Sequence, residues 1–292
     1  MHIYDYLFLD HFPLPDHLAG LLEYLHKQDD AFSRRVRREP QAYSRAETDV
    51  KTRAQEAIRR IEAVELPAYA QVWDQISEKY ADTSWDADFF LHIIDTLSPT
   101  AAPLDEEKRQ AISLAVSAYK AAKEHSLDPF LLAPCLALDI ICTLSPRHGA
   151  HGAVLLLTRL LLGQAGSNIC RYTSLEEKIC RYYYFYQRAL SRAQVHWAQN
   201  GSAYLPYMEM FLSLLYLCCQ DLPKPSIGQR GRKRAAVEAL VLSSPEPISK
   251  SEICTALPNV SPTTVEAVLG NMVKAGSIRR VGAARAARYT KP

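Results

Sequence analysis

The residues best suited to chemistry lie in one short polar stretch, Leu144-Ser-Pro-Arg-His-Gly-Ala-His-Gly-Ala-Val-Leu155. It contains two histidines, His148 and His151, and an apolar run flanks it on either side. Each run is too long for a typical strand and too short to cross a bilayer, so the runs predict buried helices. A loop that ends where a helix begins can bind an anion through free backbone amides. We therefore expect an anion site here, with the second helix starting at Ala153 and Val154.

The two loop histidines also have a spacing that fits a pair of metal ligands on one helical face. Within the loop, however, no cysteine or carboxylate could complete the coordination of a metal ion. A solvated or helix-capping pair formed by His148 and His151 is therefore the preferred interpretation, and we predict no metal site.

Helical periodicity dominates the elements that must position this loop. Before residue 227 no stretch shows the alternation of a half-buried strand, so this body is predicted to be all-α. We expect residues 1–66 to form an N-terminal arm with helices, and residues 67–222 to form an all-α core. The expected helices cover residues 18–32, 41–65, 69–80, 86–97, 105–125, 130–144, 154–162, 174–193 and 204–220.

One of these helices contains the run Arg181-Tyr-Tyr-Tyr-Phe-Tyr186, which puts aromatic rings on all of its sides. Aromatic pairs between neighbouring helices stabilise a core, and a flat ligand can also stack on such rings. Packing between helices is the preferred interpretation of this run.

Charge is distributed unevenly along the chain. From Gln229 onward there are eleven Lys and Arg and four Asp and Glu, a formal charge of +7, which leaves −5 for the first 228 residues. Such an asymmetry is typical of a tail that meets nucleic acid. The seven cysteines include no CxxC pair, which indicates reduced thiols and a cytoplasmic location. Neither a signal peptide nor a membrane helix is expected, because no basic leader and no apolar run of about 18 residues occurs.

The basic tail has the element order of a winged helix. Residues 223–231 have the composition of a linker, and residues 232–292 contain three helical segments and a β-hairpin around a glycine. In this arrangement the helix that starts at Ser261 enters the major groove of double-stranded DNA, and the hairpin holds phosphates or the minor groove. The predicted DNA contacts are Thr263, Thr264, Asn271, Lys274, Arg279, Arg280, Arg285 and Arg288. Docking of the same unit on a protein, with its basic face in solvent, remains an alternative.

The chain from Leu131-Leu-Ala-Pro-Cys-Leu-Ala-Leu-Asp139 to Tyr207 resembles the Fic (fido) family, and residues 4–9 and the winged helix resemble its long bacterial form. The resemblance implies a mainly α fold, an all-helical Fic-like domain followed by a C-terminal winged helix. Members of this family transfer AMP from ATP to a protein hydroxyl. They use a loop of the form His-Pro-Phe-x-Asp/Glu-Gly-Asn-Gly-Arg-x-x-Arg.

In an ungapped register the loop of this chain departs from that form. Leu144 stands in place of the catalytic base, His148 in place of the acidic Mg²⁺ ligand, and Leu155 in place of the second arginine. Gly149 fits, whereas Ala150, His151 and Gly152 replace Asn-Gly-Arg. Loss of a general base costs roughly 10²–10⁴ in rate, and each lost charge-stabilising donor costs on the order of 10²–10³. We therefore predict no catalytic residues in a degenerate loop, and no cofactor.

The family also has a regulatory helix whose Glu obstructs ATP, in the form Ser/Thr-x-x-x-Glu-Gly/Asn. The stretch from Ile58 to Ala63 keeps only that carboxylate, at Glu62, which is thus a remnant of an inhibitory helix. A charge on the surface of a helix is the preferred interpretation of Glu62.

The sequence leads to two main hypotheses. The first is a catalytically inactive Fic-like scaffold with a DNA-binding winged helix, a transcriptional regulator or partner-binding protein in the cytoplasm. The alternative is a protein adenylyltransferase with an altered active site, which would use ATP and Mg²⁺. A sensor that binds a nucleotide without transferring AMP is a third interpretation. A protein partner or a second copy of the chain is compatible with each, and no membrane contact is expected.

Overall fold

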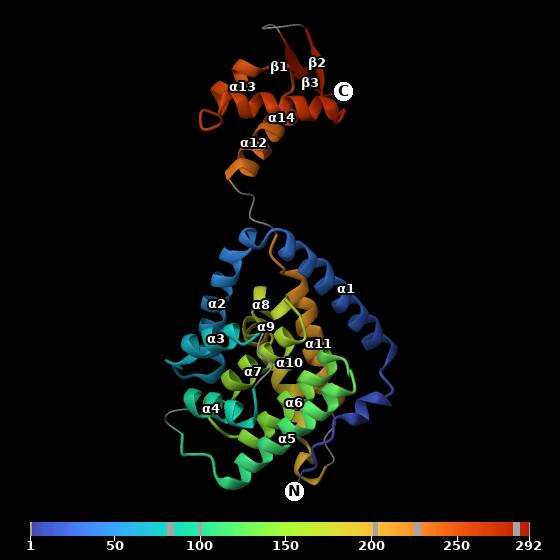
Figure 1. Ribbon diagram of the computed structural model, residues 1–292, viewed down its shortest axis with the longest axis vertical. Coiled ribbons are helices and arrows are strands. Elements are labelled where there is room, and N and C mark those ends of the chain that lie inside the picture. The colour runs from blue at the N-terminus through green and yellow to red at the C-terminus, as the bar shows by residue number, and fades with distance from the viewer. Residues whose placement is uncertain are drawn as a thin grey trace. The chain divides into compact units, whose positions relative to one another are not determined.

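The computed structural model describes residues 2–80, 85–98, 101–200, 204–224, 229–282 and 287–291, without the side chains of 229–232. The chain folds into two compact units, Met1–Lys224 and Pro225–Pro292 (Figure 1). Arg285, one of the predicted DNA contacts, lies outside the described residues, as do positions 225–228 of the predicted linker.

All regular secondary structure in the described part of the larger unit is helical, which confirms the predicted all-α body. The α-helices are α1 (Asp16–Arg38), α2 (Ser44–Glu62), α3 (Tyr69–Glu78), α4 (Ala87–Leu97), α5 (Glu106–Glu124), α6 (Pro129–Leu144), α7 (Ala150–Gln164), α8 (Ile169–Tyr172), α9 (Leu175–Arg181), α10 (Tyr183–Gln194) and α11 (Tyr204–Gln220). Three 3₁₀ turns accompany them, η1 (Leu7–Asp10), η2 (Pro40–Ala42) and η3 (Trp197–Gln199).

Helices α6 and α7 form the centre of this unit. Almost every side chain of the two helices is buried, because both are apolar on all sides rather than along one stripe. The shell around α6 consists of α5, α10 and α11, and α7 packs against α2, α3 and α4 (Figure 1). The N-terminal arm and α1 contribute to the same apolar core through Tyr6, Leu18 and Leu25. Residues 2–66 and 67–222 therefore share one core.

The smaller unit consists of α12 (Gln229–Ser243), β1 (Ile248–Ser249), α13 (Lys250–Ala256), α14 (Pro262–Lys274), β2 (Arg279–Val281) and β3 (Arg288–Thr290) (Figure 1). Its antiparallel sheet has the strand order β1-β3-β2. Of its three strands, β1 was not predicted from the sequence, because a strand of two residues shows no periodicity. The helices pack on one apolar cluster that includes Val237, Ile253, Leu269 and Ile278.

Local signals set the helix starts in the smaller unit. The side chains of Ser249 and Glu252 form a complete capping box at the start of α13. Ser261 caps α14, and Pro262 occupies its first turn, where no backbone donor is needed. None of the helices in the described ranges of the chain combines the length and apolarity that crossing a bilayer requires.

Candidate functional site

The polar loop joins α6 to α7 and is anchored at both ends. Leu144, the last residue of α6, is fully buried in the core and offers no proton acceptor. Gly149 has a φ of +85° and precedes α7, and a Cβ there would overlap the carbonyl oxygen of Leu97. A glycine is therefore required at this position. Helix α7 begins at Ala150, three residues earlier than the expected start at Ala153.

The amides at the start of α7 are already bonded to a carboxylate of the same chain. Gly149 N–H donates to Oε2 of Glu62 over 2.9 Å, and Gly152 N–H donates to Oε1 over 3.1 Å. Glu62 is the last residue of α2 and is only 7% exposed. Its interpretation as a surface charge was wrong, because α2 ends against the N-terminus of α7. A buried carboxylate there is stabilised by two amide donors and by the helix dipole. The position that we expected for an external anion is filled by Glu62.

The two histidines of the loop occupy different environments. His148 is exposed, and its backbone carbonyl accepts a hydrogen bond from Ser98 Oγ over 2.7 Å. His151 is half-buried, with Nδ1 2.8 Å from the Tyr186 hydroxyl and with the two rings edge to face. Neither side chain caps α7, where Glu62 accepts hydrogen bonds from the amides of Gly149 and Gly152. Within the ranges that the structure describes, no three His, Cys, Asp or Glu side chains are close enough to hold a metal ion.

A cavity of about 310 Å³ borders this loop. Its volume is at the small end of the range for ligand pockets. Arg147 is the only Lys or Arg among its lining residues. The Nη1 of Arg147 donates to the Ala102 carbonyl over 2.6 Å, and Nη2 lies 3.5 Å from the Asp95 carboxylate. Glu62 adds a negative charge to the same wall. The lining therefore disfavours a polyphosphate, which needs several cations or free amides. The lining residues are Ile61, Glu62, Ile141, Ser145, Pro146, Arg147, His148, Ala150, His151, Gln187, Leu190 and Gln194.

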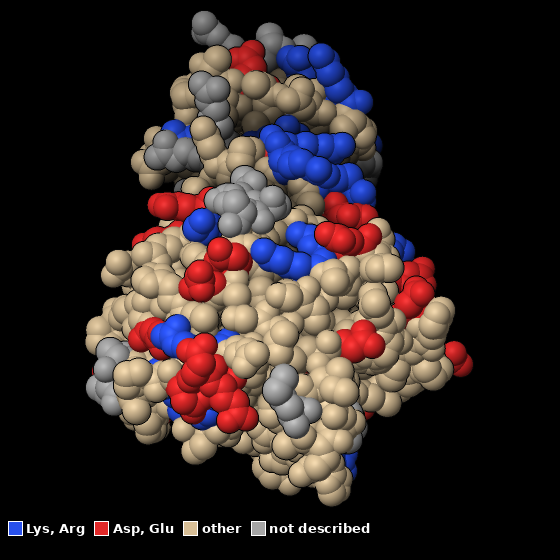
Figure 2. All heavy atoms as spheres, turned by 60° about the horizontal axis from the view of Figure 1, so that its bottom comes forward, with Lys and Arg blue, Asp and Glu red and all other residues tan. Residues whose placement is uncertain are grey.

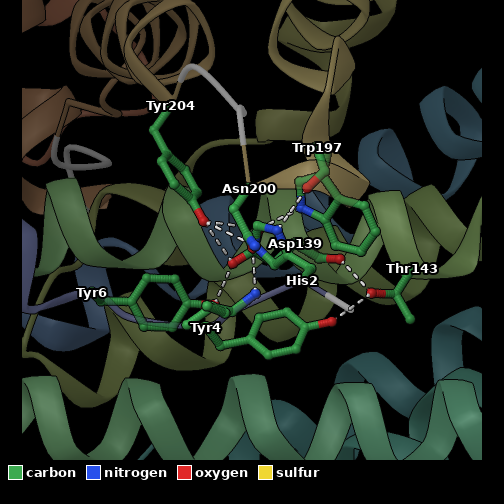
Figure 3. A network of polar contacts seen from close by, with 9 residues as sticks. His2, Tyr4, Tyr6, Asp139, Thr143, Trp197, Asn200 and Tyr204 are labelled. Atoms are coloured by element: carbon green, nitrogen blue, oxygen red, sulfur yellow. Dashed lines mark hydrogen bonds and ion pairs between the residues drawn. The ribbon is translucent and has the colours of Figure 1, made fainter.

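A second polar cluster surrounds Asp139, a fully buried carboxylate in the middle of α6 (Figure 3). Oδ2 accepts a hydrogen bond from the Tyr6 hydroxyl over 2.8 Å, and Oδ1 accepts one from Trp197 Nε1 over 2.8 Å. The Tyr204 hydroxyl donates to the same carboxylate at 3.0–3.1 Å, and His2 Nε2 lies 3.3 Å from Oδ1. Burial, together with the negative charge of Asp139, raises the pKa of Tyr6 well above its usual range, so its hydroxyl keeps its proton. The cluster holds the N-terminal arm and η3 on α6.

The predicted major-groove residues lie on α14 and its N-terminus. Thr263, Asn271 and Lys274 are exposed. Thr264 is half-buried, and its hydroxyl lies 2.8 Å from the Oγ of Ser261, the N-cap residue. Thr264 therefore takes part in the helix cap rather than standing free for a base.

Of the predicted phosphate-binding arginines that the structure describes, Arg279 and Arg280 lie on β2 and Arg288 lies on β3. Lys and Arg side chains on the face drawn in Figure 2 are blue. Arg279 and Arg280 are exposed neighbours on β2, so they point to opposite sides of the strand. Neither forms an ion pair with any residue that the structure describes. Arg288 pairs with Glu252 over 3.1 Å and donates to the Pro247 carbonyl over 2.7 Å. It is thus engaged in holding β3 to the start of α13.

The sequence matches no protein family and no curated protein. Eight chains of solved structures match. One is the crystal structure of a Fic family protein from Desulfovibrio desulfuricans G20, 13% identical over 96% of this chain and 97% of that chain, with a TM-score of 0.48. The chain is similar to a Fic family protein over nearly its whole length.

Asp139 was not predicted as a site residue, although one sequence signal pointed to it. It is the only charged residue between Phe130 and Leu144, in a run that is otherwise apolar. A buried carboxylate needs several donors, so a lone acid in such a run indicates a polar cluster. Its partners come from residues near positions 2–6 and 197–204, and no local pattern indicates them.

The environment of His151 predicts a pH dependence of stability. Burial lowers the pKa of His151, against a smaller opposing effect of the Glu62 carboxylate. The unfolded chain therefore binds more protons than the folded one between the lowered pKa and about 6.5. Stability that is present above pH 6.5 is lost as the pH falls through this window, with a slope of at most about 1.4 kcal/mol per pH unit. In urea titrations from pH 7.5 to 5, His151→Gln should lose less stability than the wild type, and an equal loss would contradict the prediction.

Proposed function

We propose that the larger unit is a catalytically inactive Fic-like scaffold and that the smaller unit binds double-stranded DNA, as in a transcriptional regulator or partner-binding protein. The observation that carries the first part is Glu62, whose carboxylate occupies the amides at the start of α7. A second observation agrees with it. Leu144, which aligns with the base of the family, is fully buried and cannot accept a proton from a substrate hydroxyl.

The absence of AMP transfer can be tested directly on the whole chain. With radiolabelled ATP, Mg²⁺ and cell extract, the wild type and a His148→Ala/His151→Ala variant should give equal, background labelling. Labelling by the wild type that the double variant loses would instead support the adenylyltransferase. The cavity beside the loop is the observation that favours the adenylyltransferase as a second candidate. That enzyme would use ATP and Mg²⁺.

Nucleotide binding is a separate outcome. In calorimetry with ATP, with and without Mg²⁺, we expect no heat of binding, because Glu62 repels a phosphate and the only lining guanidinium is paired. A saturable titration without AMP transfer would favour a nucleotide sensor over an inert scaffold.

The DNA-binding part of the proposal is supported by charge. The chain from Gln229 onward carries +7, and the side chains of Arg279 and Arg280 stand exposed on β2. Counterion release on contact with phosphates makes such binding weaken steeply as the salt concentration rises. The proposed location is the cytoplasm, supported by cysteine usage without CxxC pairs.

Arg279→Ala/Arg280→Ala should weaken binding of mixed duplex DNA by about tenfold and reduce the salt slope by about 2, since two phosphate contacts are lost. Fluorescence anisotropy of the whole chain at several salt concentrations measures both quantities. Arg37→Ala/Arg38→Ala is the matched control, because these two exposed arginines lie on α1 of the larger unit. Absence of salt-sensitive binding near micromolar concentration would overturn the DNA-binding part. Docking of the winged helix on another protein would then be the remaining interpretation of the smaller unit.

A further inference from the structure

Helices α10 and α11 run side by side and leave a groove of about 480 Å³ between them. From α10 the lining residues follow a spacing of three and four, which places them along one ridge of the helix. From α11 the lining residues follow the same spacing. Two parallel ridges with a channel between them are the geometry that receives a third helix. The lining residues are Tyr182, Phe185, Arg188, Ala189, Arg192, Pro206, Glu209, Met210, Ser213, Leu214 and Leu217.

The aromatic run at the start of α10 has exposed side chains, and one of them, Phe185, lines the groove. Tyr184 is 71% exposed and Phe185 is 60% exposed, while Tyr183 is 38% exposed. Packing between helices, the preferred interpretation of the aromatic run, applies to Tyr186, which is buried. It does not apply to Tyr184 and Phe185, the two most exposed aromatic side chains of the run. Contiguous exposed aromatic side chains next to an apolar channel are typical of protein contacts.

The groove combines an apolar floor with basic charge on one wall. Met210, Leu214 and Leu217 supply apolar surface from α11. Arg188 and Arg192, one turn apart on α10, are exposed and form no ion pair within the described ranges of the chain. The acid of the groove, Glu209, lies 3.2 Å from His17. Two arginines and one carboxylate among the lining residues leave the groove with a net positive charge.

We propose that this groove binds an amphipathic helix of another protein, one whose apolar stripe is flanked by Asp or Glu. The apolar stripe would lie against Met210, Leu214 and Leu217, with Phe185 as the aromatic anchor. Carboxylates beside the stripe would meet Arg188 and Arg192, which selects acidic over basic helices.

Charge argues against two other occupants. In a symmetric contact between two copies, the same surface of each copy meets its counterpart. Arg188 and Arg192 of one copy would then lie close to Arg188 and Arg192 of the other, and their like charges would repel. The smaller unit of this chain is itself basic, and the apolar faces of α13 and α14 pack on its own core. A single-stranded nucleic acid could stack on Phe185 and pair with the arginines, but it would leave the aliphatic floor without a complement.

Helix α10 lines both this groove and the loop cavity, each with a different set of residues. Gln187, Leu190 and Gln194 line the cavity beside α7, whereas Phe185, Arg188 and Arg192 line the groove. A partner seated in the groove would thus contact the helix that also forms one wall of the cavity. The inference goes beyond the proposed function, because it depends on neither DNA binding nor the loss of AMP transfer.

The test uses the whole chain and labelled probes of matched length. A fluorescein-labelled helical peptide of about 18 residues, with leucines at helical spacing flanked by glutamates, is compared with a peptide carrying lysines in their place. We expect the acidic peptide to bind at least about tenfold more tightly in anisotropy titrations. Arg188→Glu/Arg192→Glu should reverse this preference. Phe185→Ala should weaken the acidic peptide by about tenfold, because an anchor side chain is truncated.

Several controls make the outcome decisive. Arg37→Glu/Arg38→Glu changes the same charge on α1, outside the groove lining, and should leave the acidic peptide unaffected. Circular dichroism reports whether each variant folds. If the arginine variant unfolds, Phe185→Ala alone tests the proposal, because the Phe185 side chain is largely exposed and its truncation should not disturb the fold. Absence of acidic-peptide binding, or equal binding of both peptides, overturns the proposal. Binding of an oligo(dT) strand that Arg188→Glu/Arg192→Glu abolishes would reassign the groove to nucleic acid.

Discussion

Replacing Glu62 with alanine is expected to have two linked effects, a loss of stability and a gain of phosphate binding. The substitution leaves the amides of Gly149 and Gly152 buried without acceptors. Each unsatisfied buried donor costs about 1–3 kcal/mol, and the dipole of α7 loses its compensating charge. We expect the free energy of unfolding to fall by about 2–4 kcal/mol. For a unit of this size that lowers the Tm by roughly 5–15 °C.

The gain of function follows from the same geometry. Two free amides at the start of a helix bind an oxyanion, so inorganic phosphate should take the place of the carboxylate. Millimolar phosphate is expected to raise the Tm of Glu62→Ala and to leave the Tm of the wild type unchanged, since a ligand of the folded state adds stability by mass action. Differential scanning fluorimetry across a phosphate series measures both.

Glu65→Ala is the matched control for this experiment. Glu65 lies three residues further along and is 74% exposed at its side chain, and among the described residues it pairs with Arg59 alone, over 3.7 Å. An exposed pair of this kind contributes about 0–1 kcal/mol, so the control should lose little stability and gain no response to phosphate. An equal phosphate response in wild type and Glu62→Ala would mean that Glu62 does not block the site.

Asp139→Ala is the second substitution with a large expected effect. It removes the acceptor for Tyr6, Trp197 and Tyr204 at a position without solvent contact. Truncating one partner of a buried charged cluster costs about 3–5 kcal/mol, because the remaining polar groups stay buried without partners. The Tm should fall by roughly 6–20 °C, and Trp197 fluorescence should change as its indole N–H loses the carboxylate.

The loss should be concentrated on the N-terminal arm. Chymotrypsin is expected to cut near Tyr4 and Tyr6 much faster in Asp139→Ala than in the wild type, because the cluster that holds the arm is broken. Asp74→Ala is the control, since that carboxylate is 59% exposed and pairs with Lys51 on the surface. Similar cleavage rates and a similar Tm in the two variants would contradict the assigned role of Asp139.

Much of the architecture could be predicted from local patterns. The apolar runs around residues 130–144 and 154–162 predicted the central pair α6 and α7, because such runs can be stable only when buried. The caps at Ser249 and Ser261 predicted the starts of α13 and α14, since a cap acts within three residues of its own position. These features depend on neighbours in the sequence, which is why they were visible there.

The sequence by itself determined that leucines stand at positions 144 and 155 of the loop between α6 and α7, and a leucine side chain can neither accept a proton nor carry a charge in any fold. It also determined where the positive charge gathers. Only the tertiary structure decided what fills the site. Glu62 reaches Gly149 across 87 residues of sequence, and Tyr6 reaches Asp139 across 133. Burial and hydrogen bonding of a carboxylate depend on donors that packing brings from distant segments, and no spacing along the chain encodes those contacts.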